Sequence, residues 1–238
     1  MAELPAQPNQ SLIDGLVVLR ALAVAGEPVG SREMARRLNL EPTRINRLLK
    51  TLASIGVARQ TPDRRYVPGP AMHVLSVQAM YGSGLLRRAA TAIERLKSFK
   101  LHVALGVLWQ SQVVYLYQAR PAQSSDDALA VSGLYPAEQS GVGVPILAGM
   151  SDDDVQNLYT DRQPLGGMPA LLARLKRVRE AGHAYLARNE HRAEDALGIA
   201  IGKPAFAGLT LAGRINESQV SSLIDPLHQA AADIGAEE

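Results

Sequence analysis

Residues 31–56 read SREMARRLNLEPTRINRLLKTLASIG, and this stretch decides the fold of the first part of the chain. Its first half predicts a short helix with Ser31 as N-cap, which ends at a turn marked by Asn39. Its second half predicts a helix that begins at Pro42, since proline suits a first helical turn, and that Gly56 closes. Two helices joined by so short a turn indicate a helix-turn-helix.

The second of these helices has two different faces. One is an apolar stripe at helical spacing, made of Ile45, Leu48, Leu49, Leu52 and Ile55. The other is polar and carries Thr43, Arg44, Asn46, Arg47, Lys50 and Thr51. Arginine can donate two hydrogen bonds to guanine and asparagine can pair with adenine, and the N-terminal half of a recognition helix enters the major groove. A polar face alone is equally compatible with a solvated surface, so the neighbouring segments decide between the two interpretations.

These neighbours favour DNA binding. Upstream, Ser11 is an N-cap candidate for a helix whose apolar stripe is Leu12, Leu16, Leu19 and Ala23. Downstream, two short strands over 57–60 and 66–67 flank a Pro-Asp turn, with arginines near its tip that can contact phosphates or the minor groove. The predicted DNA-binding residues are Ser31, Arg32, Pro42, Thr43, Arg44, Asn46, Arg47, Lys50, Arg59, Arg64 and Arg65.

Charge is unevenly distributed along the chain. Residues 1–70 hold ten Lys and Arg against six Asp and Glu, whereas the remaining residues hold 15 against 17. A basic region of this kind is expected where only one domain contacts phosphates, although it also fits an ordinary solvated surface. The absence of cysteine excludes disulfides and thiolate metal sites and suits a cytoplasmic protein. No apolar run reaches the roughly 18 residues of a membrane span, and residues 1–10 predict a flexible tail rather than a signal peptide.

Four stretches, in this order, resemble the IclR family of bacterial transcriptional regulators: SLIDGLVVL (11–19), SREMARRL (31–38), RLLKTLASIG (47–56) and YVPGP (66–70). The resemblance implies a winged helix-turn-helix over 11–70, a linker helix over 71–83 and a GAF-like α+β effector-binding domain over 84–238. It also implies three partners: a double-stranded DNA operator, a small-molecule effector and further copies of the chain. The copies would form a dimer or a dimer of dimers, paired through the linker helix.

The remainder of the chain alternates between helical and strand patterns. Helices are predicted over 85–99, 151–160, 169–181 and 216–235, and strands over 101–109, 112–119, 128–134, 196–201 and 205–212. By resemblance, a further strand follows Gly182. This order is typical of an α+β fold. The basic run of Arg174, Lys176, Arg177 and Arg179 is interpreted as a solvated helix face rather than a second nucleic-acid patch.

Residues 134–149 read LYPAEQSGVGVPILAG and resemble a family segment that leads into a helix lining the effector pocket. The segment departs from the family pattern, since Glu138 stands where the family usually has His and Val144 where it usually has Lys. Pro145 predicts that the helix is kinked or starts late. The resemblance gives the expected effector-binding residues Ser140, Gly141, Val142, Ala196, Thr210 and Ala212. Trp109, Tyr115 and Tyr117 on the predicted strands could add aromatic walls to the pocket, but they are equally compatible with a place in the core.

The expected ligand follows from this lining. By resemblance, we expect a pocket that is more apolar than those of glyoxylate-type sensors in the family. We predict that it binds a small organic acid with an apolar part, held by backbone amides near Ser140 to Val142 and by the Thr210 hydroxyl. Repressor-type control is expected, although no sequence feature distinguishes a repressor from an activator.

Two other classes of function remain open: an enzyme with an accessory DNA-binding region, and a dimerisation or scaffold protein. A scaffold would not need the glycine-containing segment around Gly141. Ser140 lacks the Gly-x-Ser-x-Gly spacing of a nucleophile elbow, because position 138 is Glu. No pair among the five histidines has metal-ligand spacing on one helix: His73, His102, His183, His191 and His228. The sequence therefore predicts no catalytic residue, no metal and no cofactor.

Overall fold

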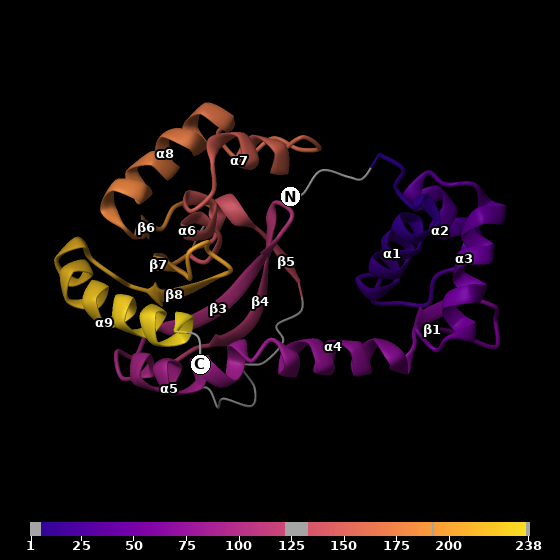
Figure 1. The fold of residues 1–238 in the computed structure, drawn as a ribbon, viewed down its shortest axis with the longest axis horizontal. Coiled ribbons are helices and arrows are strands. Elements are labelled where there is room, and N and C mark those ends of the chain that lie inside the picture. Colours follow the sequence, from indigo (N-terminus) through magenta and orange to yellow (C-terminus); the bar gives the residue numbers. More distant parts are fainter. Residues whose placement is uncertain (1–5, 122–132, 192, 237–238) are drawn as a thin grey trace. The chain divides into compact units, whose positions relative to one another are not determined.

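The computed structural model describes residues 6–121, 133–191 and 193–236, and the chain divides into two compact units at Ser83 and Gly84 (Figure 1). The first unit has one hydrophobic core and the second has two, one on each face of its sheet. Within the described residues, no helix combines the length and the apolar character needed to cross a membrane. The mixture of helices with an antiparallel sheet confirms the predicted α+β class.

The first unit is a three-helix bundle with a small wing. Its elements are α1 (Gln10–Ala23), α2 (Ser31–Leu38), α3 (Pro42–Ser54), β1 (Ala58–Gln60), β2 (Tyr66–Pro68) and α4 (Pro70–Gly82). β1 and β2 are antiparallel. Val29 and Tyr66 exchange backbone hydrogen bonds of 2.9 and 2.8 Å, which join the α1–α2 connection to the wing. Tyr66 is buried in the same core as Val18, Met34 and Ile45, so the wing is part of the folded body.

The predicted N-caps of the first two helices are wrong. The N-cap of α1 is Asn9, whose side chain accepts a hydrogen bond from the Leu12 amide at 3.1 Å, rather than Ser11. Gly30, rather than Ser31, is the N-cap of α2. α1 buries Asp14, Val18 and Leu22, whereas Leu12 and Leu16 of the apolar stripe are 61% and 58% exposed. Because α1 has apolar residues on most of its circumference, hydrophobic periodicity does not identify the face that packs.

α4 has no buried residue at all. Its exposed apolar side chains include Val74, Leu75, Val77 and Tyr81, and Tyr81 is 87% exposed. An isolated helix of this length is marginal in water, because most helical stability in proteins comes from packing an apolar face. The single chain therefore leaves an apolar helix without a core to pack on.

The second unit is a six-stranded antiparallel sheet in the order β5-β4-β3-β8-β7-β6. The strands are β3 (His102–Trp109), β4 (Gln112–Ala119), β5 (Leu134–Pro136), β6 (Ala184–Leu186), β7 (Asp195–Ile201) and β8 (Ala207–Gly213). Of the strand predicted over 128–134, residues 128–132 lie outside the described residues, and β5 begins at Leu134. The strand predicted over 112–119 is observed with these bounds, and the ends of the others shift by at most two residues.

Helices cover both faces of this sheet (Figure 1). α5 (Leu85–Lys97) and α9 (Glu217–Gly235) pack on one face. The 3₁₀ turn η2 (Ala137–Gln139), α6 (Gly143–Ala148), α7 (Asp152–Leu158) and α8 (Met168–Ala181) lie on the other. α6 starts only at Gly143, which places Pro145 in its first turn and confirms the prediction of a late start.

The β3–β4 hairpin contains an irregularity that decides which side chains face which layer. The register shifts between Leu105, paired with Tyr117, and Gly106, paired with Tyr115, so that Leu116 has no opposite residue. In a regular strand Tyr115 and Tyr117 would point to the same face. Because of the extra residue, Tyr117 packs in the core between the sheet and helices α5 and α9, whereas Tyr115 lies on the face that α6 covers.

Candidate functional site

The exposed stripe of α3 is the first candidate site. Thr43, Arg47 and Lys50 are exposed and Asn46 is half-buried, and their spacing of three and four residues places them on one side of the helix. Ile45 and Leu49 on the opposite side are fully buried. Packing of that apolar side therefore fixes which four polar residues face away from the protein.

Arg44 belongs to a different part of the helix. Its Nε lies 2.6 Å from Oδ2 of Asp14, which is buried on α1. Gln10 donates to the other carboxylate oxygen of Asp14 at 2.8 Å. The guanidinium of Arg44 therefore compensates a buried charge inside the protein, which distinguishes it from Arg47.

The wing holds its three arginines in different ways. Arg65 donates to the Pro28 carbonyl at 3.1 Å and forms an ion pair of 3.4 Å with Asp63, so it fastens the wing to the body. Arg64 has a positive φ of 60° at the tip, and Arg59 is exposed on β1. Thr61 closes the turn, since its hydroxyl donates to the Arg65 carbonyl at 3.0 Å.

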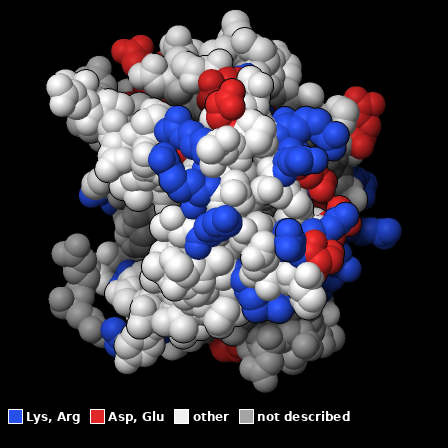
Figure 2. Space-filling view, turned by 90° about the vertical axis from the view of Figure 1, so that its right-hand side faces the viewer, with Lys and Arg blue, Asp and Glu red and all other residues white. Residues whose placement is uncertain are grey.

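Ion pairing leaves the net positive charge of this unit on a few side chains. Asp14, Glu27, Glu33 and Asp63 are paired with Arg44, Arg37 and Arg65. Within the described residues, six cations of this unit have no carboxylate partner: Arg32, Arg36, Arg47, Lys50, Arg59 and Arg64. Figure 2 shows patches of Lys and Arg on the surface seen there, with acidic side chains among them.

A hollow of about 500 Å³ lies between α2 and α3 and is lined by Arg32, Arg36 and Arg44. Arg36 is the cation that the sequence interpretation missed. It lies one helical turn after Arg32, a spacing that could have indicated it.

The second candidate site is a pocket of about 330 Å³ in the second unit, on the face of the sheet that α6 covers. It brings together five of the predicted effector-binding residues, namely Ser140, Gly141, Ala196, Thr210 and Ala212, and also Tyr115. Its other lining residues are His102, Ala104, Gln118, Arg120, Tyr135, Gln139, His191, Ala193 and Glu194. Alternate residues of neighbouring strands face the same side of a sheet, which is why these distant positions meet.

Three residues expected in this pocket do not line it. Tyr117 is buried in the opposite core because of the irregularity in β4. Trp109 is the last residue of β3, at the hairpin end, and is partly exposed. Val142 is fully buried, and its backbone and side chain lie against Gly208 and Gly106 of the sheet, close enough that an added Cβ at Gly208 would be 2.5 Å from the Val142 carbonyl oxygen.

Two amides near the predicted anion-holding position bind a side chain of the protein itself. Ser140 Oγ accepts hydrogen bonds from the amides of Val142 at 3.0 Å and Gly143 at 3.1 Å, and it also bonds the Tyr115 hydroxyl at 2.9 Å. The Thr210 hydroxyl donates to the Leu197 carbonyl at 3.0 Å. The Val142 and Gly143 amides therefore bind Ser140 rather than a ligand.

The pocket also carries more polar side chains than the sequence interpretation named. Its lining includes two histidines, Arg120, Glu194 and two glutamines, which the sequence interpretation did not place there. His102 Nδ1 lies 3.4 Å from Glu194 Oε2, and its buried Nε2 has no hydrogen-bond partner among the described residues. The pocket thus offers polar groups of both signs around two tyrosine rings.

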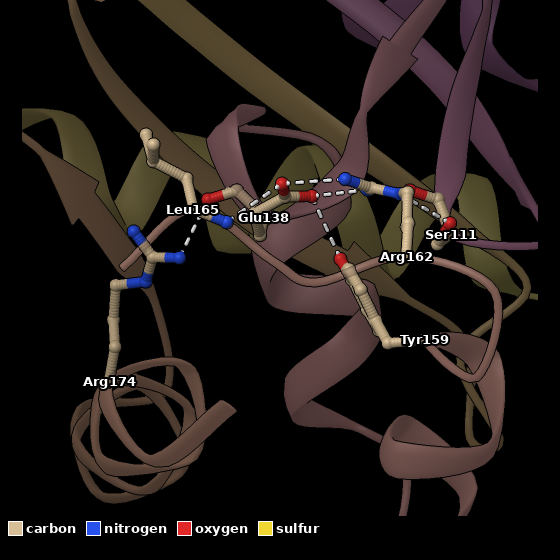
Figure 3. A network of polar contacts seen from close by, with 6 residues as sticks. All are labelled: Ser111, Glu138, Tyr159, Arg162, Leu165 and Arg174. Carbon is tan, nitrogen blue, oxygen red and sulfur yellow. Dashed lines mark hydrogen bonds and ion pairs between the residues drawn. The ribbon is translucent and has the colours of Figure 1, made fainter. Parts of the chain in front are cut away.

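Glu138 lies outside this pocket, in a buried network (Figure 3). Arg162 donates to both of its carboxylate oxygens, at 3.0 and 2.7 Å, and the Tyr159 hydroxyl donates at 2.9 Å. Burial alone would raise the pKa of Glu138, but the hydrogen bonds from Arg162 and Tyr159 outweigh it and hold that pKa below its usual value. Arg162 also donates to Ser111, so the network ties η2 to the β3–β4 turn.

The basic run on α8 divides into two pairs. Arg174 donates to the Glu138 carbonyl at 2.7 Å (Figure 3), and Arg179 donates to the carbonyls of Ala148 and Met150 at 2.8 and 2.9 Å. Lys176 and Arg177 are exposed. The interpretation as a solvated face fits Lys176, Arg177 and Arg179, which are exposed, and is wrong for the half-buried Arg174.

No group of three or more His, Asp or Glu side chains that could hold a metal ion occurs in the described parts of the chain. Neither candidate site therefore offers a metal-ligand set, and the geometry of both is that of binding sites built from hydrogen-bonding and charged side chains.

The chain is similar to known transcriptional regulators. Residues 11–62 match the IclR helix-turn-helix domain. The HTH-type transcriptional regulator BhcR of Paracoccus denitrificans is 27% identical over 220 residues, covering 85% of this chain and 78% of BhcR.

Solved structures share the whole fold at lower identity. An IclR family transcriptional regulator from Brucella abortus has a TM-score of 0.82 at 19% identity, covering 98% of this chain and 95% of its own. An IclR homologue from Microbacterium hydrocarbonoxydans, solved in complex with 4-hydroxybenzoate, has a TM-score of 0.71 at 19% identity, covering 94% and 97%.

Proposed function

We propose that this chain, which belongs to the IclR family of transcriptional regulators, binds operator DNA through α3 and the wing and that a small molecule in the second unit controls this binding. We further propose repressor-type control, in which the effector releases the operator. A protein that acts on DNA in this way works in the cytoplasm. No arrangement among the described residues favours a catalytic role, so we propose none.

The exposed stripe of Thr43, Asn46, Arg47 and Lys50 carries this proposal. The stripe begins in the first turn of α3, and the N-terminal part of a recognition helix is the part that reaches base edges. Arg47 and Asn46 can read guanine and adenine, while Lys50 and the wing arginines supply phosphate contacts. The six cations without carboxylate partners all belong to α2, α3 or the wing, as DNA binding requires.

Selection of bound duplexes from a random DNA pool by the full chain tests this directly. The proposal expects enrichment of one sequence made of two related half-sites, because a symmetric oligomer presents two recognition helices. Recovery of duplexes with no common sequence, from a folded protein at moderate salt, would contradict operator reading.

For the effector, we propose a small organic acid with hydrogen-bonding groups. Arg120 and the pocket histidines favour an anionic ligand, and the buried Nε2 of His102 is a polar atom that a ligand could satisfy. The volume of about 330 Å³ suits a ligand of this size. The relative solved with 4-hydroxybenzoate supports the same ligand class.

A thermal-shift screen of small carboxylic, hydroxy and aromatic acids tests the effector proposal, since a ligand that binds only the folded state raises Tm. Each hit is then titrated into Thr210→Val and Arg120→Gln. Weaker binding to both variants supports this pocket, and unchanged binding to both contradicts it. Release of the selected operator by the hit supports effector-controlled release, and tighter operator binding in its presence contradicts it.

Oligomer formation is part of the proposal. α1 exposes Leu12 and Leu16, and α4 exposes a row of apolar side chains with no core in the single chain. A second copy can bury both surfaces, which supports a dimer or a dimer of dimers paired through α4.

A further inference from the structure

A second hollow, of about 530 Å³, lies at the opposite end of α6 from the effector pocket. The effector pocket is bounded by Ser140 and Gly141, just before α6, whereas this hollow is bounded by Pro145 and Ala148 within α6 and by Gly149 just after it. α8, the turn that joins β7 to β8, and α9 complete its walls. The two hollows share no lining residue.

The second hollow combines an apolar wall with a few basic side chains. Most of its wall is small and apolar, including Ala148, Ala200, Pro204 and Ala205. Its ionisable lining residues are Arg179, Lys203 and His228, and none of its lining residues is acidic. The volume and the mixture of an apolar floor with a few polar groups are those of small-molecule sites.

The three basic groups are not equivalent. Arg179 forms an ion pair of 2.8 Å with Asp152 and donates to the Ala148 and Met150 carbonyls, so its charge is largely compensated. Lys203 is exposed and has no hydrogen-bond or ion-pair partner among the described residues. His228 is exposed on α9 across the hollow. An uncompensated ammonium thus stands at the edge of an apolar floor.

We propose that this hollow is a second ligand site, which binds a compact organic anion with an apolar body, such as an aryl or short alkyl carboxylate. The anionic group interacts with Lys203 at the rim, and the apolar body covers Pro145, Ala200 and Ala205. Such a ligand matches both features of the site, because a charged group alone would leave the floor unused and a neutral apolar molecule would leave Lys203 unused.

The walls of the second site and of the effector pocket pack against the same residue, Gly198. A Cβ added at Gly198 would lie 1.8 Å from the Gly141 carbonyl oxygen and 3.2 Å from Pro145 Cγ. Gly141 in the wall of one pocket and Pro145 in the wall of the other therefore rest on the same glycine, and every residue of α6 between the pockets is buried. Occupation of the second site is thus expected to change effector affinity, with a reciprocal effect of the effector on the second site.

Fluorine-detected NMR titration of the full chain with 4-fluorobenzoate tests the proposal. The effector pocket is first filled by Ala212→Phe, and the folded state of each variant is checked by thermal unfolding. The proposal expects saturable binding of one 4-fluorobenzoate per chain in this background, and weaker binding of the neutral analogue 4-fluorobenzyl alcohol.

Two further changes in the same background locate the site. Lys203→Glu is expected to weaken 4-fluorobenzoate binding about tenfold or more, and Ala200→Phe to abolish it. Lys176→Glu makes the same charge change on the exposed face of α8 and is expected to leave binding unchanged. Loss of all binding in Ala212→Phe alone, or equal effects of Lys203→Glu and Lys176→Glu, would overturn the second site. Neither result bears on operator binding, which is measured separately.

Discussion

Nε of Arg44 on α3 lies 2.6 Å from Oδ2 of Asp14 on α1, a carboxylate that is only 4% exposed. This pair joins α3, which carries the stripe proposed to read DNA, to α1, which packs against it. Arg47, three residues further along α3, is exposed instead. Two arginines of the same helix therefore have different surroundings: Arg44 pairs with a buried carboxylate, and Arg47 lies in the exposed stripe.

Arg44→Ala is expected to lower the free energy of unfolding by about 1–3 kcal/mol, because it leaves the buried Asp14 carboxylate without its cation. Chemical denaturation of the full chain measures this. In an Asp14→Asn background, Arg44→Ala should lower the free energy of unfolding clearly less, since the buried charge is already gone. An equal loss of unfolding free energy in the two backgrounds would show that the pair does not stabilise the fold.

The wing prediction concerns Arg64. Arg64→Asn keeps a residue that tolerates the positive φ at this position while it removes the charge. Binding should weaken for all duplex sequences alike, and the slope of log K against log salt should decrease by about 1, as for one lost phosphate contact. Fluorescence anisotropy at several salt concentrations gives the slope, and an unaltered slope would mean that the wing tip does not meet DNA.

The Glu138 network predicts a pH dependence. Because the folded state holds the pKa of Glu138 below its ordinary value of 4.5, the stabilisation is complete above about pH 4.5 and is lost as the pH falls through the lowered value. Glu138→Gln should therefore lower stability at neutral pH by about 2–3 kcal/mol and flatten the acid limb of the stability curve. Glu180→Gln, an exposed carboxylate on α8, is the matched control and should change neither. A parallel acid limb in parent and Glu138→Gln would contradict this role.

The α4 prediction concerns assembly. Light scattering of the parent at micromolar concentration should give a mass of at least twice the 25.5 kDa chain. Val77→Lys, which places a charge in the exposed apolar row, should shift the protein toward the monomer. Lys50→Glu leaves that row intact and should keep the oligomer. A monomeric parent would rule out pairing through α4.

Local sequence signals were sufficient for the helices of the helix-turn-helix, because its turn residues and apolar stripe all lie close together in the sequence, although the predicted N-caps Ser11 and Ser31 were displaced. Long-range features were not predictable in the same way. The side on which Tyr117 lies depends on one unpaired residue, Leu116, in the hairpin, which the alternation of the strand does not reveal. Arg44 and Glu138 looked like surface or ligand groups because their partners, Asp14 and Arg162, are 30 and 24 residues away and become neighbours only in the fold.

The most direct test of DNA reading by α3 compares Arg47→Ala with Arg177→Ala, an exposed arginine of α8 outside both candidate sites. Both variants remove one positive charge, and both are expected to unfold like the parent. On the selected operator duplex, Arg47→Ala should raise Kd by the equivalent of about 1–3 kcal/mol and relax the preference at one base position of each half-site, whereas Arg177→Ala should bind like the parent. Parent-like affinity and base preference of a folded Arg47→Ala would contradict the assignment of α3 as the recognition helix.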